Sequence, residues 1–136
     1  MDERLLKERF FKFALSVVRL TEKFPNEQPY FVIKNQIVKS STSSAANYRA
    51  VCRARSSADF LNKLGVVEEE LDETLFWLEF TESVNSKWSA EIAPIYQEGD
   101  ELLSIIVASI ITTKKKLMEA AKQSRFSNPQ SSNPKN

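Results

Sequence analysis

Few side chains in this sequence have the chemistry of a reactive centre. The chain has 136 residues, a single cysteine and no histidine, so the imidazole base that usually activates a serine or cysteine nucleophile is absent. Cys52 lies between Arg49 and Arg53, and neighbouring cations can lower the pKa of a thiol. A semi-buried packing cysteine is nevertheless the simpler interpretation. We therefore expect that the protein is not an enzyme.

Carboxylates suggest a second chemistry, a di-metal site like that of the bundle iron proteins. All but one of residues 68–73 are acidic. Bundle di-iron sites, however, use Glu-x-x-His pairs that project inward from facing helices, and this chain has no histidine. It also lacks the clustered glycines that cradle phosphates, since its two glycines are Gly65 and Gly99. We therefore predict a solvated acidic face, with no metal and no other cofactor.

Basic residues offer the more informative chemistry. Cations that gather on a helix surface can neutralise the phosphates of RNA or DNA. Alternatively, lysines near the end of a helix complement its dipole, and arginines pair with acids of another helix or another subunit. Both interpretations stay open at this point. The candidate nucleic-acid-binding residues are Lys39, Arg49, Arg53, Lys114, Lys115 and Lys116.

Charge is distributed unevenly along the chain. Residues 1–67 carry a net charge of +6, residues 68–112 carry −10 and residues 113–136 carry +5, although the whole chain has a net charge of +1. Such a chain can pair its basic first half with its acidic middle, either within one molecule or between subunits. The charge distribution therefore favours a protein that assembles with itself.

The elements that must position these side chains are predicted to be helices. Apolar residues recur at steps of three and four along most of the chain, which is the spacing of one face of an α-helix. Ser56, three residues before Asp59, marks one helix start. The pattern predicts helices over about 3–23, 30–54, 56–83 and, from a start between Ser89 and Pro94, to about 122.

Four amphipathic helices joined by short loops favour an all-α, antiparallel up-and-down four-helix bundle. We expect one bundle domain over residues 1–123, a length typical of single domains. Residues 124–136 are rich in serine, asparagine and proline and are predicted to form a disordered tail. The small residues 40–46 predict that a neighbouring helix approaches the second helix closely.

No segment predicts export or membrane insertion. Residues 1–15 alternate charged and apolar side chains, unlike a signal peptide. The longest apolar stretch, residues 102–111, contains two serines and is far shorter than the roughly 20 residues of a membrane span. Because one cysteine cannot form an internal disulfide, we expect a reducing compartment, the cytoplasm.

Three motifs in the first two thirds of the chain resemble a known family. They are QIVKSSTSSAANYR at 36–49, SADFLNKL at 57–64 and ETLFWL at 73–78. Over roughly residues 9–116 the chain closely resembles the bacterial four-helix-bundle proteins encoded by intervening sequences in 23S rRNA genes. The resemblance implies a ring-shaped homopentamer with no assigned enzymatic activity.

A related group also looks similar in fold, the accessory proteins of diversity-generating retroelements. Members of that group assist a reverse transcriptase and bind nucleic acid through a basic surface. By that analogy the partners of this chain would be RNA or DNA and a reverse transcriptase.

Residues within the matching motifs also have a direct structural interpretation. Asn47 is expected to face another helix and to satisfy its amide by interhelical hydrogen bonds, because a buried unpaired amide costs roughly 1–3 kcal/mol. Asp59 fits the first turn of the third helix. Trp77, like the neighbouring aromatics Phe76, Phe80 and Trp88, is expected in the core or at a subunit interface.

The sequence supports two functional hypotheses. The preferred one is a non-enzymatic, homo-oligomeric interaction or assembly module whose basic first two helices face its acidic last two, within or between subunits. The alternative is a nucleic-acid-binding accessory protein that uses the basic residues given above.

Overall fold

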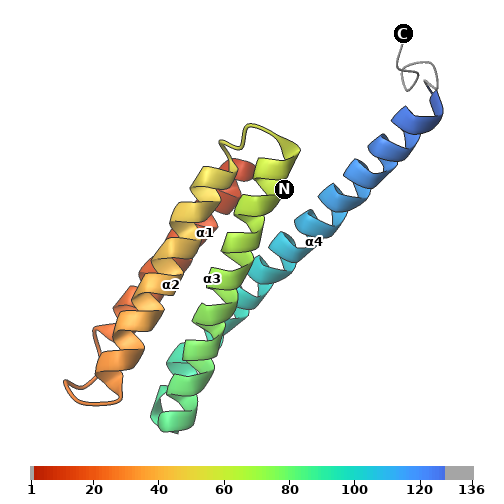
Figure 1. Cartoon of the computed structure of the whole chain (residues 1–136). Coiled ribbons are helices and arrows are strands. Elements are labelled where there is room, and N and C mark those ends of the chain that lie inside the picture. The colour runs from red at the N-terminus through yellow and green to blue at the C-terminus, as the bar shows by residue number, and fades with distance from the viewer. Residues whose placement is uncertain (1, 128–136) are drawn as a thin grey trace.

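The computed structural model describes residues 2–127, which form an all-α fold of four long helices (Figure 1). Consecutive helices run antiparallel, so the predicted up-and-down arrangement is confirmed. The elements are α1 Glu3–Thr21, α2 Tyr30–Val51, α3 Ser57–Val84, a short 3-10 helix η1 at Ser86–Trp88, and α4 Ser89–Ser127.

The start of α3 follows the predicted capping pattern. Ser56 is the N-cap residue, and its hydroxyl accepts a hydrogen bond from the Asp59 amide at 3.0 Å. This bond satisfies one of the amides that have no partner within the helix. The preceding helix α2 ends at Val51 rather than at the expected Ala54, because residues 52–54 form a turn instead.

The fourth helix is longer than the sequence suggested. It contains Pro94 beyond its first turn and continues to Ser127, because residues 114–123 are strong helix formers. The predicted disordered tail therefore begins too early, since residues 124–127 are helical. The rest of that tail, 128–136, lies outside the described residues.

Small residues let α2 and α3 pack closely, as predicted. Ser40, Ser41 and Ser44 are buried on α2, and each hydroxyl donates to a carbonyl three residues earlier in α2, at 3.3, 3.3 and 2.7 Å respectively. The Ser40 and Thr74 hydroxyl oxygens also lie 2.7 Å apart across the contact. Among the described residues no buried side-chain nitrogen or oxygen lacks a partner, so this polar interface carries no desolvation penalty from an unpaired group.

Ion pairs join α1 to the first part of α4. Arg9 donates to both oxygens of Glu98, at 2.9 and 2.7 Å, and to Glu101 at 3.0 Å. Lys23 pairs with Glu91 at 2.5 Å. Pairing of basic α1 with acidic α4, which the charge distribution predicted, is therefore present within one chain.

Aromatic side chains close the end of the bundle at which the α1–α2 loop meets η1. Trp88 is buried, and its indole N–H donates to the Tyr30 hydroxyl at 3.1 Å. The ring of Phe24 lies 5.1 Å from each of these two rings, between centroids. Of the two positions that the sequence left open for Trp88, core or interface, the structure shows the core.

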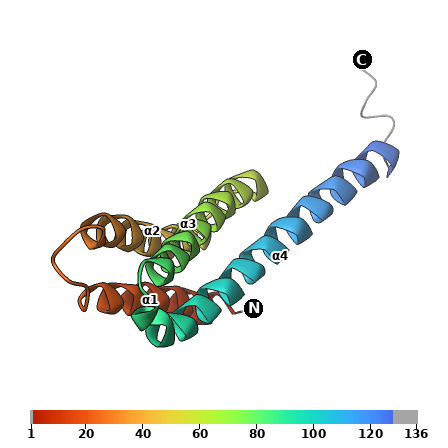
Figure 2. The same ribbon diagram turned by 90° about the horizontal axis from the view of Figure 1, so that it is seen from below.

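The second half of α4 leaves the bundle. Both ribbon views show it apart from the other three helices (Figures 1 and 2). Ile106 is the last buried residue in the described part of α4, and every side chain from 114 to 126 is exposed. We call residues 114–126 the α4 projection. Its large exposed apolar residues are Leu117, Met118 and Phe126.

The surroundings of the two glycines predict opposite effects of alanine. A Cβ atom at Gly99 would lie 2.9 Å from Leu75 and Phe13 atoms, so we expect Gly99→Ala to destabilise the fold by about 1–2 kcal/mol net, after overpacking is offset by better helix propensity. At Gly65 a Cβ atom would meet no described atom within 4 Å, and Gly65→Ala should add about 0.5–1 kcal/mol. Urea unfolding measures both; two changes of the same sign would contradict this difference.

Candidate functional site

A groove lined mainly by cations lies at one end of the bundle, where the end of α2, the α2–α3 loop and the start of α3 meet. Arg49 and Arg53 are four residues apart and therefore share one face of the chain as α2 ends. The loop contributes Arg55 and α3 contributes Lys63. The groove has a volume of about 720 Å³ and is lined by these four cations together with Ala46, Ala50 and Asp59. We call it the basic groove.

Asp59 neutralises only part of the positive charge in the basic groove. Its carboxylate accepts hydrogen bonds from the Lys63 ammonium and, at 3.1 Å, from the Arg55 backbone amide. These bonds, the one from Lys63 above all, hold the pKa of Asp59 below its usual value. In the described part of the chain no ion pair involves the side chain of Arg49, Arg53 or Arg55. Three guanidinium groups, whose planar donors suit phosphate, are therefore left for an anion.

The other predicted nucleic-acid-binding residues lie elsewhere. Lys39 is exposed on α2 but does not line the basic groove. Lys114, Lys115 and Lys116 lie on the α4 projection and are exposed there. The sequence grouped these lysines with Arg49 and Arg53 as one surface, whereas the structure brings only the arginines together. Lys63, which was not predicted, joins them because α3 starts beside the end of α2.

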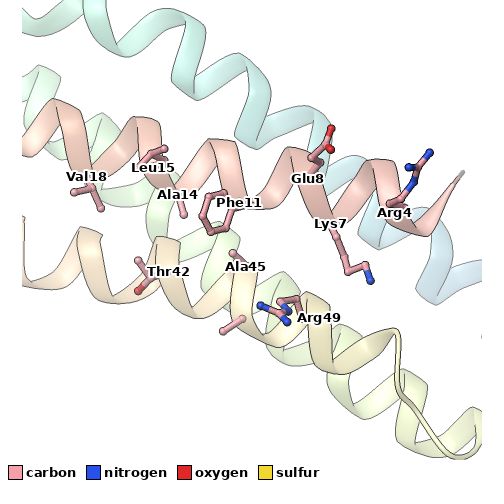
Figure 3. Close-up of a pocket in the computed structure, with 11 residues that line it drawn as sticks. Arg4, Lys7, Glu8, Phe11, Ala14, Leu15, Val18, Thr42, Ala45 and Arg49 are labelled. Atoms are coloured by element: carbon pink, nitrogen blue, oxygen red, sulfur yellow. The ribbon is translucent and has the colours of Figure 1, made fainter.

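An apolar groove between α1 and α2 adjoins the basic groove (Figure 3). Its volume is about 550 Å³, and Arg49 lines both grooves. Phe11 and Leu15 of α1 line the apolar groove together with small residues of α2, and Arg4 and Lys7 lie at one end. The sequence did not predict this groove, because it depends on how α1 lies against the small residues of α2. We call it the α1–α2 groove.

The structure assigns a different role to Asn47 than the sequence suggested. Its amide donates to the Ser43 carbonyl at 2.8 Å and to the Ser43 hydroxyl at 3.0 Å. Both bonds lie within α2, so the prediction of interhelical hydrogen bonds is wrong. A serine four residues earlier offers a local partner, and such local bonds compete with tertiary ones.

The aromatic residues of α3 form a cluster on its surface. Trp77 is half-buried, and its ring centroid lies 4.9 Å from that of Phe76 and 5.6 Å from that of Phe80. The indole N–H of Trp77 donates to Glu73 at 3.3 Å. Asp59, in contrast, occupies the first turn of α3 as predicted. A role of Trp77 at a subunit interface stays a prediction.

Cys52 is half-buried at the end of α2, which agrees with the simpler interpretation of a semi-buried packing cysteine. Burial, and to a lesser degree the nearby Glu3 carboxylate, raise the pKa of its thiol. The alternative, a pKa lowered by Arg49 and Arg53, is therefore wrong, because burial disfavours the thiolate and the cation that acts on this thiol is Lys7, whose effect is smaller.

The raised pKa predicts a slow reaction of Cys52 with alkylating reagents, since only the thiolate is nucleophilic. At pH 8 iodoacetamide should label the native chain at least about tenfold more slowly than the urea-unfolded chain. Mass spectrometry of timed samples gives both rates. Equal rates would show that the Cys52 thiol is not shielded from the reagent and that its pKa is not raised.

The acidic residues 68–73 do not converge on a common point. No three Asp, Glu, Cys or His side chains within the described residues are arranged to hold a metal ion. Nor does any described helix combine the length and the apolar character needed to cross a membrane. The two grooves and the exposed aromatic cluster are therefore the surfaces on which a function can be argued.

Comparison with known proteins identifies the family. The family model of the 23S rRNA-intervening sequence protein matches residues 5–108. This chain belongs to that family. The resemblance that the motifs at 36–49, 57–64 and 73–78 indicated is thereby confirmed.

A solved structure supports the family membership of this chain. A crystal structure of a protein of unknown function from the S23 ribosomal protein family of Bacteroides thetaiotaomicron is 33% identical in sequence. The comparison covers 77% of this chain and 97% of that chain, with a TM-score of 0.71. A comparison with curated proteins gave no match.

The family match divides the candidate surfaces of this chain into two groups. The basic groove, the aromatic cluster of α3 and almost all of the α1–α2 groove lie within the matched residues 5–108. The α4 projection, with its three lysines, lies beyond them. A property shared across the family is therefore better sought at the grooves and the cluster.

Proposed function

We propose that this protein is a non-enzymatic, homo-oligomeric assembly protein. The observation that supports this proposal is the apolar surface that a single chain leaves uncovered. Single proteins rarely expose large contiguous apolar patches unless these bind a partner. Exposed apolar residues lie together in two places, at Phe76 and Phe80 with the half-buried Trp77 on α3 and at Phe11 and Leu15 in the α1–α2 groove. The other large apolar residues that are at least 38% exposed are Leu5, Phe31, Val32, Val66, Val84, Ile111, Leu117, Met118 and Phe126.

The α4 projection adds to the same argument. Isolated helices shorter than about 12–15 residues are marginal in water, because most helical stability in proteins comes from packing an apolar face. The projection is about that length and has no buried side chain between residues 114 and 126. A second copy that covers its apolar residues would supply the missing packing. The expected stoichiometry, taken from the family resemblance, is a ring of five.

Light scattering coupled to size-exclusion chromatography tests self-assembly. The proposal predicts that the unmodified chain elutes at micromolar concentration with the mass of two or more chains, each of 15.6 kDa. The mass should persist from low to moderate salt, because buried apolar contacts are insensitive to screening whereas exposed ion pairs weaken. A mass of one chain under every condition would refute the proposal.

The basic groove supports a second candidate function. We propose that the protein is a cytoplasmic accessory protein whose basic groove binds the phosphate backbone of RNA or DNA. Its protein partner would be a reverse transcriptase. Three guanidinium groups without ion-pair partners in the described residues support the nucleic-acid part of this proposal. The reverse transcriptase rests on the fold analogy alone. Mobility-shift assays across a salt series test binding, and no shift even at low salt would reject it.

A further inference from the structure

The exposed side of α3 carries an apolar ridge. Phe76 is 51% exposed and Phe80 is 42% exposed, and the half-buried Trp77 packs against both. The rings of Phe76 and Phe80 also lie 6.0 Å apart between centroids. These three residues therefore form one continuous aromatic surface, which we call the α3 ridge.

Acidic residues surround the α3 ridge. Between residues 64 and 84, α3 contains seven carboxylates and no basic residue. Glu73 lies next to the ridge and accepts the Trp77 indole hydrogen bond at 3.3 Å. Glu79 accepts a hydrogen bond from the Tyr96 hydroxyl of α4 at 2.7 Å. The ridge is thus an apolar surface with a negative border.

The α1–α2 groove has the complementary features. Its apolar wall contains Phe11, which is 64% exposed, and Leu15, which is 38% exposed. Its charged lining residues are three cations, Arg4, Lys7 and Arg49, against one acid, Glu8. The groove is thus an apolar hollow with a positive border.

These two surfaces are uncovered in the same chain. Figure 3 views the groove with α3 and α4 behind α1 and α2, so the groove opens away from these two helices. Neither surface is covered within its own chain, since Phe11, Phe76 and Phe80 all remain exposed. A second copy of the chain offers each surface the complementary one.

We propose that the α3 ridge of one copy docks into the α1–α2 groove of the next copy. This proposal rests on the proposed self-assembly and names its interface. The aromatic residues provide anchors, of the type that dominates interface energetics. The acids around the ridge face the cations of the groove, which favours this pairing over ridge to ridge or groove to groove, where like charges would meet.

The proposed contact is head-to-tail, because it joins two different surfaces of the same chain. Such a contact closes into a ring when the rotation between copies permits, and otherwise forms a filament. It differs from a two-fold contact in one testable respect. A copy that has lost only its ridge can still accept a ridge in its groove.

Complementation between two variants tests this geometry. Phe11→Glu places a negative charge in the groove, where it repels the acids around an incoming ridge. The double variant Phe76→Ser/Phe80→Ser removes the exposed rings of the ridge. All three side chains are at least 42% exposed, so circular dichroism should show folded proteins. If Phe11→Glu does not fold, Arg49→Glu blocks the groove by charge alone.

The expected result is that each variant alone runs as a single chain in light scattering at micromolar concentration. An equimolar mixture should instead give a species of two chains and no larger one, because one ridge and one groove remain intact. Asn35→Glu is the matched control: it adds the same negative charge as Phe11→Glu at an exposed position of α2 that lies outside both surfaces, and it should assemble as the unmodified chain does.

The possible outcomes separate this inference from the proposed function. A monomeric unmodified chain would refute both self-assembly and the docking. An oligomeric unmodified chain whose variants also assemble would refute only the docking. Monomeric variants whose mixture stays monomeric would also refute it, because the surfaces would then not bind each other.

Discussion

Replacing Trp88 with alanine is expected to lower the free energy of unfolding by about 3–5 kcal/mol. The indole is buried against Phe24 and Tyr30 at the end of the bundle. Its removal leaves a cavity and takes away the hydrogen-bond donor of the Tyr30 hydroxyl. Urea unfolding followed by circular dichroism measures the loss. Protein concentration must be held fixed, because assembly couples stability to concentration.

Two further variants separate the causes of this effect. Trp88→Phe keeps much of the packing but removes the N–H, so it should cost only about 1–2 kcal/mol. Phe80→Ala, on the exposed side of α3, should change the stability of the single chain by less than about 1 kcal/mol. Equal losses for Trp88→Ala and Phe80→Ala would contradict the assignment of Trp88 to the core and Phe80 to the surface.

Neutralising the basic groove should produce the largest change in nucleic-acid binding. The triple variant Arg49→Gln/Arg53→Gln/Arg55→Gln removes the three guanidinium groups that have no ion-pair partner in the described residues. Each lost phosphate contact should reduce the salt slope by about 0.7–0.9, so affinity at 0.1 M salt should fall roughly 100-fold. Fluorescence anisotropy with a labelled RNA and a labelled DNA across a salt series measures both quantities.

The charge-matched control for this experiment is Lys12→Gln/Arg19→Gln/Lys87→Gln, which makes the same change in net charge at exposed positions outside the groove. It should retain most of the affinity. A second comparison, Lys114→Gln/Lys115→Gln/Lys116→Gln, tests the lysines on the α4 projection. If the groove variant binds as well as the charge-matched control, the basic groove is not the binding site.

The periodicity of apolar residues was sufficient to predict the four helices and their antiparallel order. The period is a local property, and so is the Ser56–Asp59 cap, which the structure reproduces. The end of α4 could not be predicted in the same way. Its apolar pattern continues through Leu117 and Met118, and nothing in that pattern tells whether a residue packs against its own chain or projects from it.

The candidate site was predicted only where residues adjacent in sequence stay adjacent in space. Arg49 and Arg53 share a face because they are four residues apart. Lys63 reaches the same groove through the α2–α3 turn, and the α1–α2 groove depends on the packing of two helices. Both therefore required the tertiary structure. The local bond of Asn47 to Ser43 could have been anticipated, since a serine precedes it by four residues.

Hydrogen exchange in the α4 projection tests most directly the central claim, that other copies cover the apolar surface that one chain leaves open. Residues 114–126 have no buried side chain, so in a single chain their amides should exchange quickly. Mass spectrometry of the intact, unmodified protein should therefore find these amides protected at micromolar concentration and unprotected after dilution into the nanomolar range. Rapid exchange of residues 114–126 at every concentration, alongside a protected first half of α4, would contradict the claim that other copies cover this surface.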